Sequence, residues 1–220
     1  MGWGHAAGDV VSLLTVDTIV SELELLFYGH ETAVETDNTL PTMRTLHQWI
    51  DKAVGEANDE IQRYTAEKLN SARTSGTTMA MAFLYGESVV IANIGDSRTY
   101  AWRNGELTQI TRDHSFMAQL AEKGTITREE QWVHLMRNII LRAIGTEKTA
   151  EVDFYLWHME QGDKLLLCTD GLWQAYLEEG VLAERLMESE EAAGLCETLV
   201  YEANERDGSD NISAVVVTVE

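Results

Sequence analysis

Two segments near the start of the chain carry apolar residues at the spacing of an amphipathic helix. The first covers residues 9–27 and the second covers residues 44–70, and in both the apolar positions recur every three or four residues. This spacing lines one face of a helix with side chains that can pack against a core. The polar segment 29–42 between them contains Pro41, the only proline of the chain, and predicts a loop.

The pattern changes at residue 75, where short apolar runs alternate with turn sequences. The runs SGTTMAMAFLY, VVIANIG, TYAWR and ELTQI predict a four-stranded antiparallel meander over residues 75–110. The pair Asn104-Gly105 is a hairpin signal because both residues tolerate a positive φ. Further strands are predicted at residues 152–159, at residues 164–169 and in the final run ISAVVVTV.

Helices are predicted between and after these strands. Two short helices follow the meander, and the second begins at TREE, where Thr127 and Glu130 match a capping box. Residues 177–206 predict helices rich in glutamate. This order of helices, hairpins, helices and a final strand favours an α+β layered fold over alternating βαβ units. A length of 220 residues suits one large domain.

The composition limits the classes of partner. Hydrophobic residues make up 45% of the chain, enough for a substantial core. Asp and Glu number 37 against 16 Lys and Arg, and the formal net charge of -21 repels phosphate backbones, so we expect no nucleic-acid partner. No apolar run approaches the ~20 residues that cross a bilayer, so we expect no membrane contact and a cytoplasmic protein. An acidic chain can instead hold divalent cations.

The two cysteines fit a reducing compartment. Cys168 lies in the apolar run LLLC, and Cys196 lies in a helical pattern. Their spacing matches no metal motif, and two isolated thiols of this kind are typical of cytosolic proteins rather than of disulfide-stabilised ones.

Three aspartates stand at the ends of predicted strands. Asp96 ends the strand in VVIANIGDSR, Asp170 ends the strand in KLLLCTDGLW, and Asp210 precedes the last strand in DGSDNISAVVVTV. Because the end of one antiparallel strand and the start of its neighbour share an edge, the three carboxylates can converge there. Carboxylates brought together repel one another unless a proton or a cation neutralises them. Mg²⁺ and Mn²⁺ prefer such oxygen ligands.

Each of these motifs also has a plainer interpretation. Gly-Asp-Ser, Asp-Gly and Ser-Asp-Asn are all ordinary turn sequences when taken singly. His114 can support the site or be a hydrogen-bonded structural histidine. Arg98 can orient the acidic turn or form a surface ion pair, Trp173 fits a core position better than a substrate contact, and His5 fits a loop histidine near the first helix.

Taken together and in this order, the motifs resemble those of the metal-dependent serine/threonine protein phosphatases, the PPM or type 2C family, and in particular its bacterial members. GDSR, TDGLW and GSDN carry the resemblance, with SGTT at residues 75–78 and TRDHS at residues 111–115. LAEKGTITREEQWVHLMRNIILRAIGT resembles the flap of bacterial members, through the residues His134, Arg137, Asn138, Arg142 and Gly145. A proline usually follows that histidine in the family, and Leu135 stands there in this chain.

The resemblance implies a single domain over residues 1–220, with two mainly antiparallel sheets packed as a sandwich and flanked by helices. It implies hydrolysis of phosphoserine and phosphothreonine in proteins by a water that two, or in some members three, Mg²⁺ or Mn²⁺ ions activate. Asp170 and Asp210 would bind the first ion, and Asp96 would serve the additional, looser site. The resemblance assigns no general acid to this chain. We expect a monomer that acts on phosphorylated proteins in signal transduction.

The first metal motif of the family is incomplete in this sequence. The family has an Asp-Gly pair before a glycine-rich turn, and its aspartate bridges the two ions. Here the chain begins at Met1-Gly2-Trp3-Gly4-His5, so the Asp-Gly pair and the strands before it are absent from the sequence. We therefore expect an N-terminally incomplete domain, inactive or nearly so as written. The alternatives are a catalytically inactive phosphatase-like domain that binds phosphoproteins or regulates a partner, and a structural metal-binding domain.

Overall fold

The computed structural model describes residues 2–3, 7–33, 41–68, 75–176, 179–188 and 191–219. The chain forms two compact units. The first comprises residues 1–78 and 142–152, and the second comprises residues 79–141 and 153–220. The single domain expected from the sequence stays a prediction.

The first unit is built on two long helices. Helix α1 (Gly8–Ala33) and helix α2 (Met43–Lys68) pack along each other, and the strands β1 (Gly2–Trp3) and β2 (Gly76–Thr77) form a short antiparallel pair. The apolar stripe of α2 is buried as its spacing predicts, through Leu46, Ile50, Ala53, Val54, Ala57 and Ile61. Both predicted helices are confirmed, although residues 69–70 lie outside the described residues.

The loop predicted at residues 29–42 is wrong at its start, because α1 continues to Ala33. The rings of Phe27 and His30 pack edge-on against Trp49 of α2, with centroids 4.9 and 5.4 Å away. This tertiary packing extends the helix past Gly29, where local propensity favours a stop. Residues 34–40 lie outside the described residues.

The second unit contains two antiparallel sheets. The first has the order β3-β4-β7, from the strands Met79–Tyr85, Ser88–Ile94 and Asp153–His158. The second has the order β6-β5-β8-β9, from Glu106–Gln109, Arg98–Arg103, Lys164–Cys168 and Ala214–Thr218. The prediction of an α+β fold with two mainly antiparallel sheets is confirmed.

The continuous four-stranded meander predicted over residues 75–110 is wrong. Its two hairpins, β3–β4 and β5–β6, belong to different sheets. The chain passes from one sheet to the other at residues 95–97, where Gly95 has a φ of 101°. The alternation of apolar residues predicts where each strand lies but not which sheet the strand joins. The sharp turn at Gly95 determines the sheet that β5 joins. The hairpin at Asn104 and Gly105 is confirmed, with φ values of 52° and 89°.

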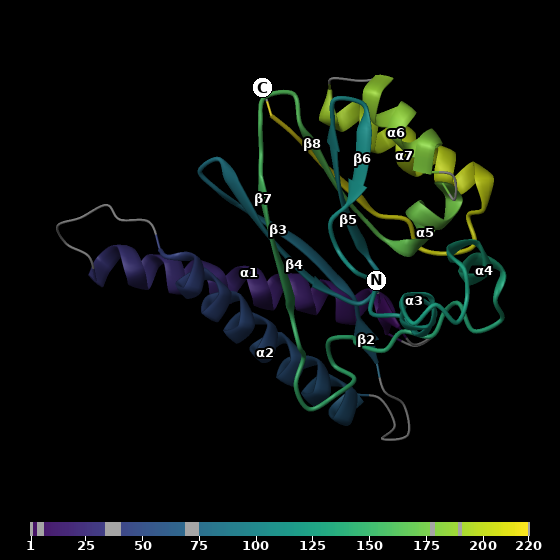
Figure 1. The fold of residues 1–220 in the computed structure, drawn as a ribbon. Helices are drawn as coiled ribbons and strands as arrows, with labels where there is room; N and C mark the ends of the chain where they lie inside the picture. The colour runs from purple at the N-terminus through teal and green to yellow at the C-terminus, as the bar shows by residue number, and fades with distance from the viewer. Residues whose placement is uncertain are drawn as a thin grey trace. The chain divides into compact units, whose positions relative to one another are not determined.

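One core fills the space between the sheets, and another lies between the second sheet and its helices. Val89, Ile91, Ala101, Leu165 and Leu167 form the first core. The second core joins Tyr100, Leu166 and Cys168 to side chains of α6 (Glu179–Glu188) and α7 (Ala192–Arg206). Figure 1 shows these two helices together beside the second sheet.

The second unit also contains three shorter helices. They are α3 (Phe116–Glu122), α4 (Arg128–Val133) and α5 (Asp170–Trp173), with a 3-10 turn at Gln174–Tyr176 after the last. The predicted capping box is confirmed, because Thr127 Oγ1 accepts from the Glu130 N–H at 3.2 Å and Glu130 Oε2 accepts from the Thr127 N–H at 2.7 Å. Within the described part of the chain, no helix combines the length and the hydropathy that a membrane crossing needs.

Candidate metal site and the cavity beside it

The three predicted aspartates lie at one edge of the second sheet. Arg98 at the start of β5 lies opposite Cys168 at the end of β8, and Cys168 lies opposite Ala214 at the start of β9. The three strand ends therefore meet at the same edge of the sheet. The turns next to these ends carry Asp96, Asp170 and Asp210.

The turns of Asp170 and Asp210 are tied together by hydrogen bonds from the side chain and the backbone of Thr169. Thr169 Oγ1 donates to the Asn211 carbonyl at 3.0 Å and accepts from the Ser213 N–H at 3.0 Å. The Thr169 N–H donates to the Ser213 carbonyl at 3.1 Å. A Cβ placed on Gly171 would lie 2.5 Å from the Asn211 carbonyl oxygen, so only glycine fits where the turns touch. Sequence reasoning missed Thr169 and Gly171, whose roles depend on a partner far along the chain.

The carboxylates sit in an environment that opposes their charge. Burial and, after it, the carboxylates of Asp170 and Asp113 raise the pKa of Asp96 to about 7, against the lowering effect of Arg98. Burial raises the pKa of Asp170 to about 6, with repulsion from Asp210 as the next cause. Asp96 and Asp170 are 4% and 8% exposed, whereas Asp210 is exposed. The site thus combines two buried acids with one that faces solvent.

The chemistry of these donors fits a hard divalent cation. A cation would offset both the burial and the repulsion that raise the pKa of these two carboxyl groups. Among the described residues, no three or more His, Cys, Asp and Glu side chains already stand in the arrangement of a metal cluster. The assignment of Asp96, Asp170 and Asp210 as metal ligands therefore stays a prediction, supported by their convergence and by their mutual repulsion.

The raised pKa of Asp96 predicts that this carboxylate destabilises the metal-free protein at neutral pH. The folded state holds a proton on Asp96 up to a pKa of about 7, while the unfolded chain releases it near pH 4, so this group lowers stability as pH rises between those values. We expect Asp96→Asn to raise the free energy of unfolding at pH 8 in EDTA, on the order of 2 kcal/mol. The gain should shrink toward pH 5, as urea titrations at both pH values can measure. A variant less stable than the parent at pH 8 would contradict this.

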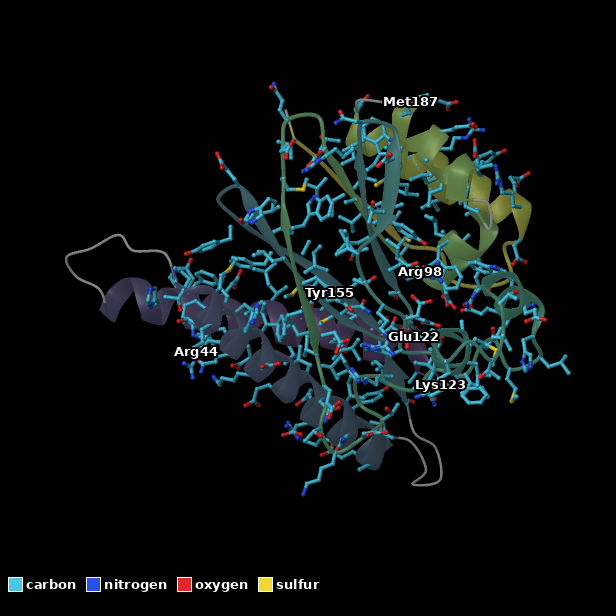
Figure 2. The ribbon with its side chains drawn as sticks, viewed as in Figure 1. Arg44, Arg98, Glu122, Lys123, Tyr155 and Met187 are labelled. Carbon is cyan, nitrogen blue, oxygen red and sulfur yellow. The ribbon has the colours of Figure 1, made fainter. Side chains whose placement is uncertain are left out.

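The positively charged side chain of Arg98 is buried close to Asp96. The Arg98 guanidinium donates to Asp113 from Nε at 2.9 Å and from Nη2 at 2.7 Å, and donates to Tyr100 Oη at 2.8 Å. It also stacks 3.5 Å from the Trp173 ring and 5.6 Å from the Trp132 ring, and Figure 2 shows Arg98 in the region of α4 and α5. The surface ion pair considered for Arg98 is therefore wrong, since the pair with Asp113 is buried.

Trp173 connects the Arg98 guanidinium to the turn that carries Asp96. It is a core residue, as its sequence position indicates, but its indole N–H also donates to the Asp96 carbonyl at 2.9 Å. Arg98 therefore supports the turn through the Trp173 ring.

His114 is a buried, hydrogen-bonded histidine, with ring nitrogens 3.1 Å from the Gly95 N and 3.0 Å from Asp153 Oδ2. Asp113 lies within TRDHS, but nothing in the sequence marks it as the partner of Arg98. His5 and Met1 lie outside the described residues.

A cavity of about 160 Å³ opens beside Asp96. The Arg98–Asp113 pair forms part of its wall, and the rings of Trp132 and Trp173 pack edge to face at 5.5 Å next to it. The remaining lining residues are Ser115, Met117, Gln131, Arg137, Gln174 and Asp207. The cavity thus places aromatic, amide and charged groups within reach of a molecule bound at the acidic edge.

Known proteins resemble this chain along nearly its whole length. A family model described as Protein phosphatase 2C matches residues 4–208. The serine/threonine phosphatase stp of Listeria innocua is 36% identical over 218 residues, which cover 97% of this chain and 80% of that protein. The serine/threonine protein phosphatase PstP of Mycobacterium tuberculosis is 32% identical over 216 residues, covering 98% of this chain and 38% of that protein.

Solved structures agree with these sequence matches. The crystal structure of the Mycobacterium tuberculosis serine/threonine phosphatase PstP/Ppp superposes with a TM-score of 0.81 at 32% identity, and covers 100% of this chain and 86% of that chain. The catalytic domain of PstP in complex with 2 manganese ions superposes with a TM-score of 0.79 at 31% identity, and covers 100% of this chain and 85% of that chain.

Proposed function

The chain is an enzyme of the protein phosphatase 2C family, and from this premise we propose that it hydrolyses phosphoserine and phosphothreonine in proteins. The family membership confirms the resemblance that GDSR, TDGLW and GSDN indicate. The observation that carries the proposal is the position of Asp96, Asp170 and Asp210 at one edge of the second sheet, where burial and, after it, neighbouring carboxylates raise the pKa of Asp96 and Asp170. The relatives named serine/threonine phosphatases support the same substrate class.

These three aspartates would hold Mg²⁺ or Mn²⁺, two ions or three in a complete site. When bound, such ions lower the pKa of a water molecule and offset the negative charge of a phosphate group. The solved relative with 2 manganese ions supports Mn²⁺ as one suitable ion. Asp170 would be the central ligand, because it interacts electrostatically with both Asp96 and Asp210.

The chain's own residues supply orientation and access. The Gly171 N–H donates to Asp170 Oδ1 at 2.9 Å and the Asn211 N–H donates to Asp210 Oδ1 at 2.7 Å, which fixes one oxygen of each carboxylate and leaves the other for a ligand. Asp210 is exposed, so a phosphate on a protein surface can approach from its side. Trp173 holds the Asp96 backbone in place by its hydrogen bond.

The substrates would be phosphorylated proteins, and the setting would be signal transduction in the cytoplasm, with the enzyme acting as a monomer. The acidic composition and the two free cysteines support this setting. The alternative of a catalytically inactive domain gains no support from the relatives, which are named as phosphatases.

Release of phosphate from a phosphothreonine peptide tests the proposal. The protein should be assayed with Mn²⁺, with Mg²⁺ and with EDTA. We expect slow release that requires Mn²⁺ or Mg²⁺, stops with EDTA and favours phosphothreonine over phosphotyrosine. Absence of metal-dependent release would refute the proposed function.

A further inference from the structure

The segment that carries α3 and α4 is closed at its base by a short antiparallel contact. We call residues 116–139 the flap segment. The Phe116 N–H donates to the Ile139 carbonyl at 2.9 Å, and the Leu141 N–H donates to the His114 carbonyl at 2.7 Å. Ser115 and Ile140 face each other in an isolated bridge between these bonds. The backbone of His114 thus forms one side of the base of the flap segment.

The other groups of His114 hold the turn that carries Asp96. The His114 N–H donates to the Gly95 carbonyl at 2.8 Å, and the Gly95 N–H donates to His114 Nδ1 at 3.1 Å. Because a backbone N–H can only donate, Nδ1 is the acceptor and the proton of the neutral ring is on Nε2. That nitrogen lies 3.0 Å from Asp153 Oδ2 at the start of β7, and His114 is 6% exposed.

We propose that His114 is a positioning residue that fastens the Gly95–Asp96 turn to the base of the flap segment. Gly95 has a φ of 101°, a conformation that the local sequence does not enforce, so the turn depends on outside contacts for its shape. His114 supplies two of these contacts and, through its carbonyl, one contact to Leu141 at the base of the flap segment. A shift of the imidazole would move the backbone next to Asp96 and the end of the flap segment together.

The consequence for metal binding rests on the proposed function, since it takes Asp96 as a ligand of the looser ion. If His114 merely fills space, every replacement of similar size should behave alike. If it positions the turn, the group that accepts from the Gly95 N–H should decide the outcome. Asparagine places its Oδ1 near the position of Nδ1, whereas glutamine places its polar end nearer to Nε2 and leaves the Gly95 N–H without that acceptor.

The test compares His114→Asn with His114→Gln. Hydrogen exchange at Gly95 and Leu141 reads the coupling directly, without any metal. We expect both amides to exchange about tenfold faster in His114→Gln and near the parent rate in His114→Asn. Calorimetric titration with Mn²⁺ should show about tenfold weaker binding at the looser site in His114→Gln, with the tighter site unchanged, and less than about threefold weakening in His114→Asn.

A matched control is His158→Asn, which removes an exposed histidine at the other end of β7, where its Nδ1 lies 2.8 Å from Ser88 Oγ. His158→Asn should change neither the exchange rates of the Gly95 and Leu141 amides nor the affinity for Mn²⁺. Equal exchange rates at Gly95 and Leu141 in the two His114 variants would overturn the proposal, as would faster exchange at Gly95 with Leu141 unaffected. A parent protein that binds no Mn²⁺ would count against the proposed function, while the exchange comparison would still decide the role of His114.

Discussion

Asp170→Asn should weaken Mn²⁺ binding by more than about a hundredfold and remove whatever metal-dependent phosphate release the parent protein shows. Loss of a group that only hydrogen-bonds to a metal ligand already changes metal affinity by roughly 10–100-fold, so the loss of a ligand should exceed that range. Asp170 interacts electrostatically with both other carboxylates, because it contributes to the raised pKa of Asp96 and Asp210 contributes to the raised pKa of Asp170. Its removal should therefore weaken binding at both positions. Calorimetric titration with Mn²⁺ measures the affinity, and release from a phosphothreonine peptide measures the turnover.

The ranking among the three aspartates makes this expectation specific. Asp210→Asn should also strongly weaken binding of the more tightly held ion, whereas Asp96→Asn should weaken mainly the binding of the more loosely held ion. Glu106→Gln is the control, because it removes one negative charge from an exposed position on β6 of the same sheet. It should leave binding within about twofold, since exposed charges are screened by solvent and salt. Similar small effects in all four variants would show that the three aspartates are not the ligands.

The candidate site could be predicted from sequence because its aspartates stand beside strands with clear apolar runs. Once GDSR, TDGLW and GSDN are placed at strand ends, antiparallel pairing alone brings Asp96, Asp170 and Asp210 to one edge. The residues that support them carry no such local signal. Asp113 is an ordinary loop aspartate until the fold places it against Arg98, and Thr169 is an ordinary threonine until its hydroxyl meets Asn211 and Ser213.

The two errors about the fold have the same origin. Local turn signals favour a continuous meander and a loop from residue 29, but sheet membership and helix length depend on contacts between distant segments. The turn after β4 takes the chain into the other sheet, where β5 pairs with β6 and β8. Trp49 packs on the last turns of α1 and prolongs that helix. Periodicity predicts elements well because it reports burial, and it reports nothing about which partner buries them.

The contact between the Asp170 turn and the Asp210 loop offers a second strong test, because the two can approach so closely only where Gly171 has no side chain. Gly171 has no positive φ, so its backbone conformation does not itself require glycine. What excludes a side chain is the neighbouring loop, whose Asn211 carbonyl oxygen and carbonyl carbon would lie 2.5 and 3.1 Å from an added Cβ. Both atoms belong to the backbone, so relief requires the loop itself to move. That movement would carry Asp210 away from Asp170.

Gly171→Ala should therefore reduce stability and metal affinity together. Overpacking of this kind lowers the free energy of unfolding by about 1–3 kcal/mol. We expect Mn²⁺ binding at the tighter site to weaken by at least about tenfold, because both of its expected ligands lose their relative position.

Gly180→Ala is the matched control, since Gly180 lies in α6 with nothing within 4 Å of an added Cβ. It should be neutral or stabilise the protein by up to about 1 kcal/mol, because alanine favours a helix over glycine. Urea unfolding in EDTA measures the stability of each variant, and calorimetry measures the affinity. If Gly171→Ala lost stability but kept the full Mn²⁺ affinity of the parent, the spacing of the two turns would not be what holds the ion.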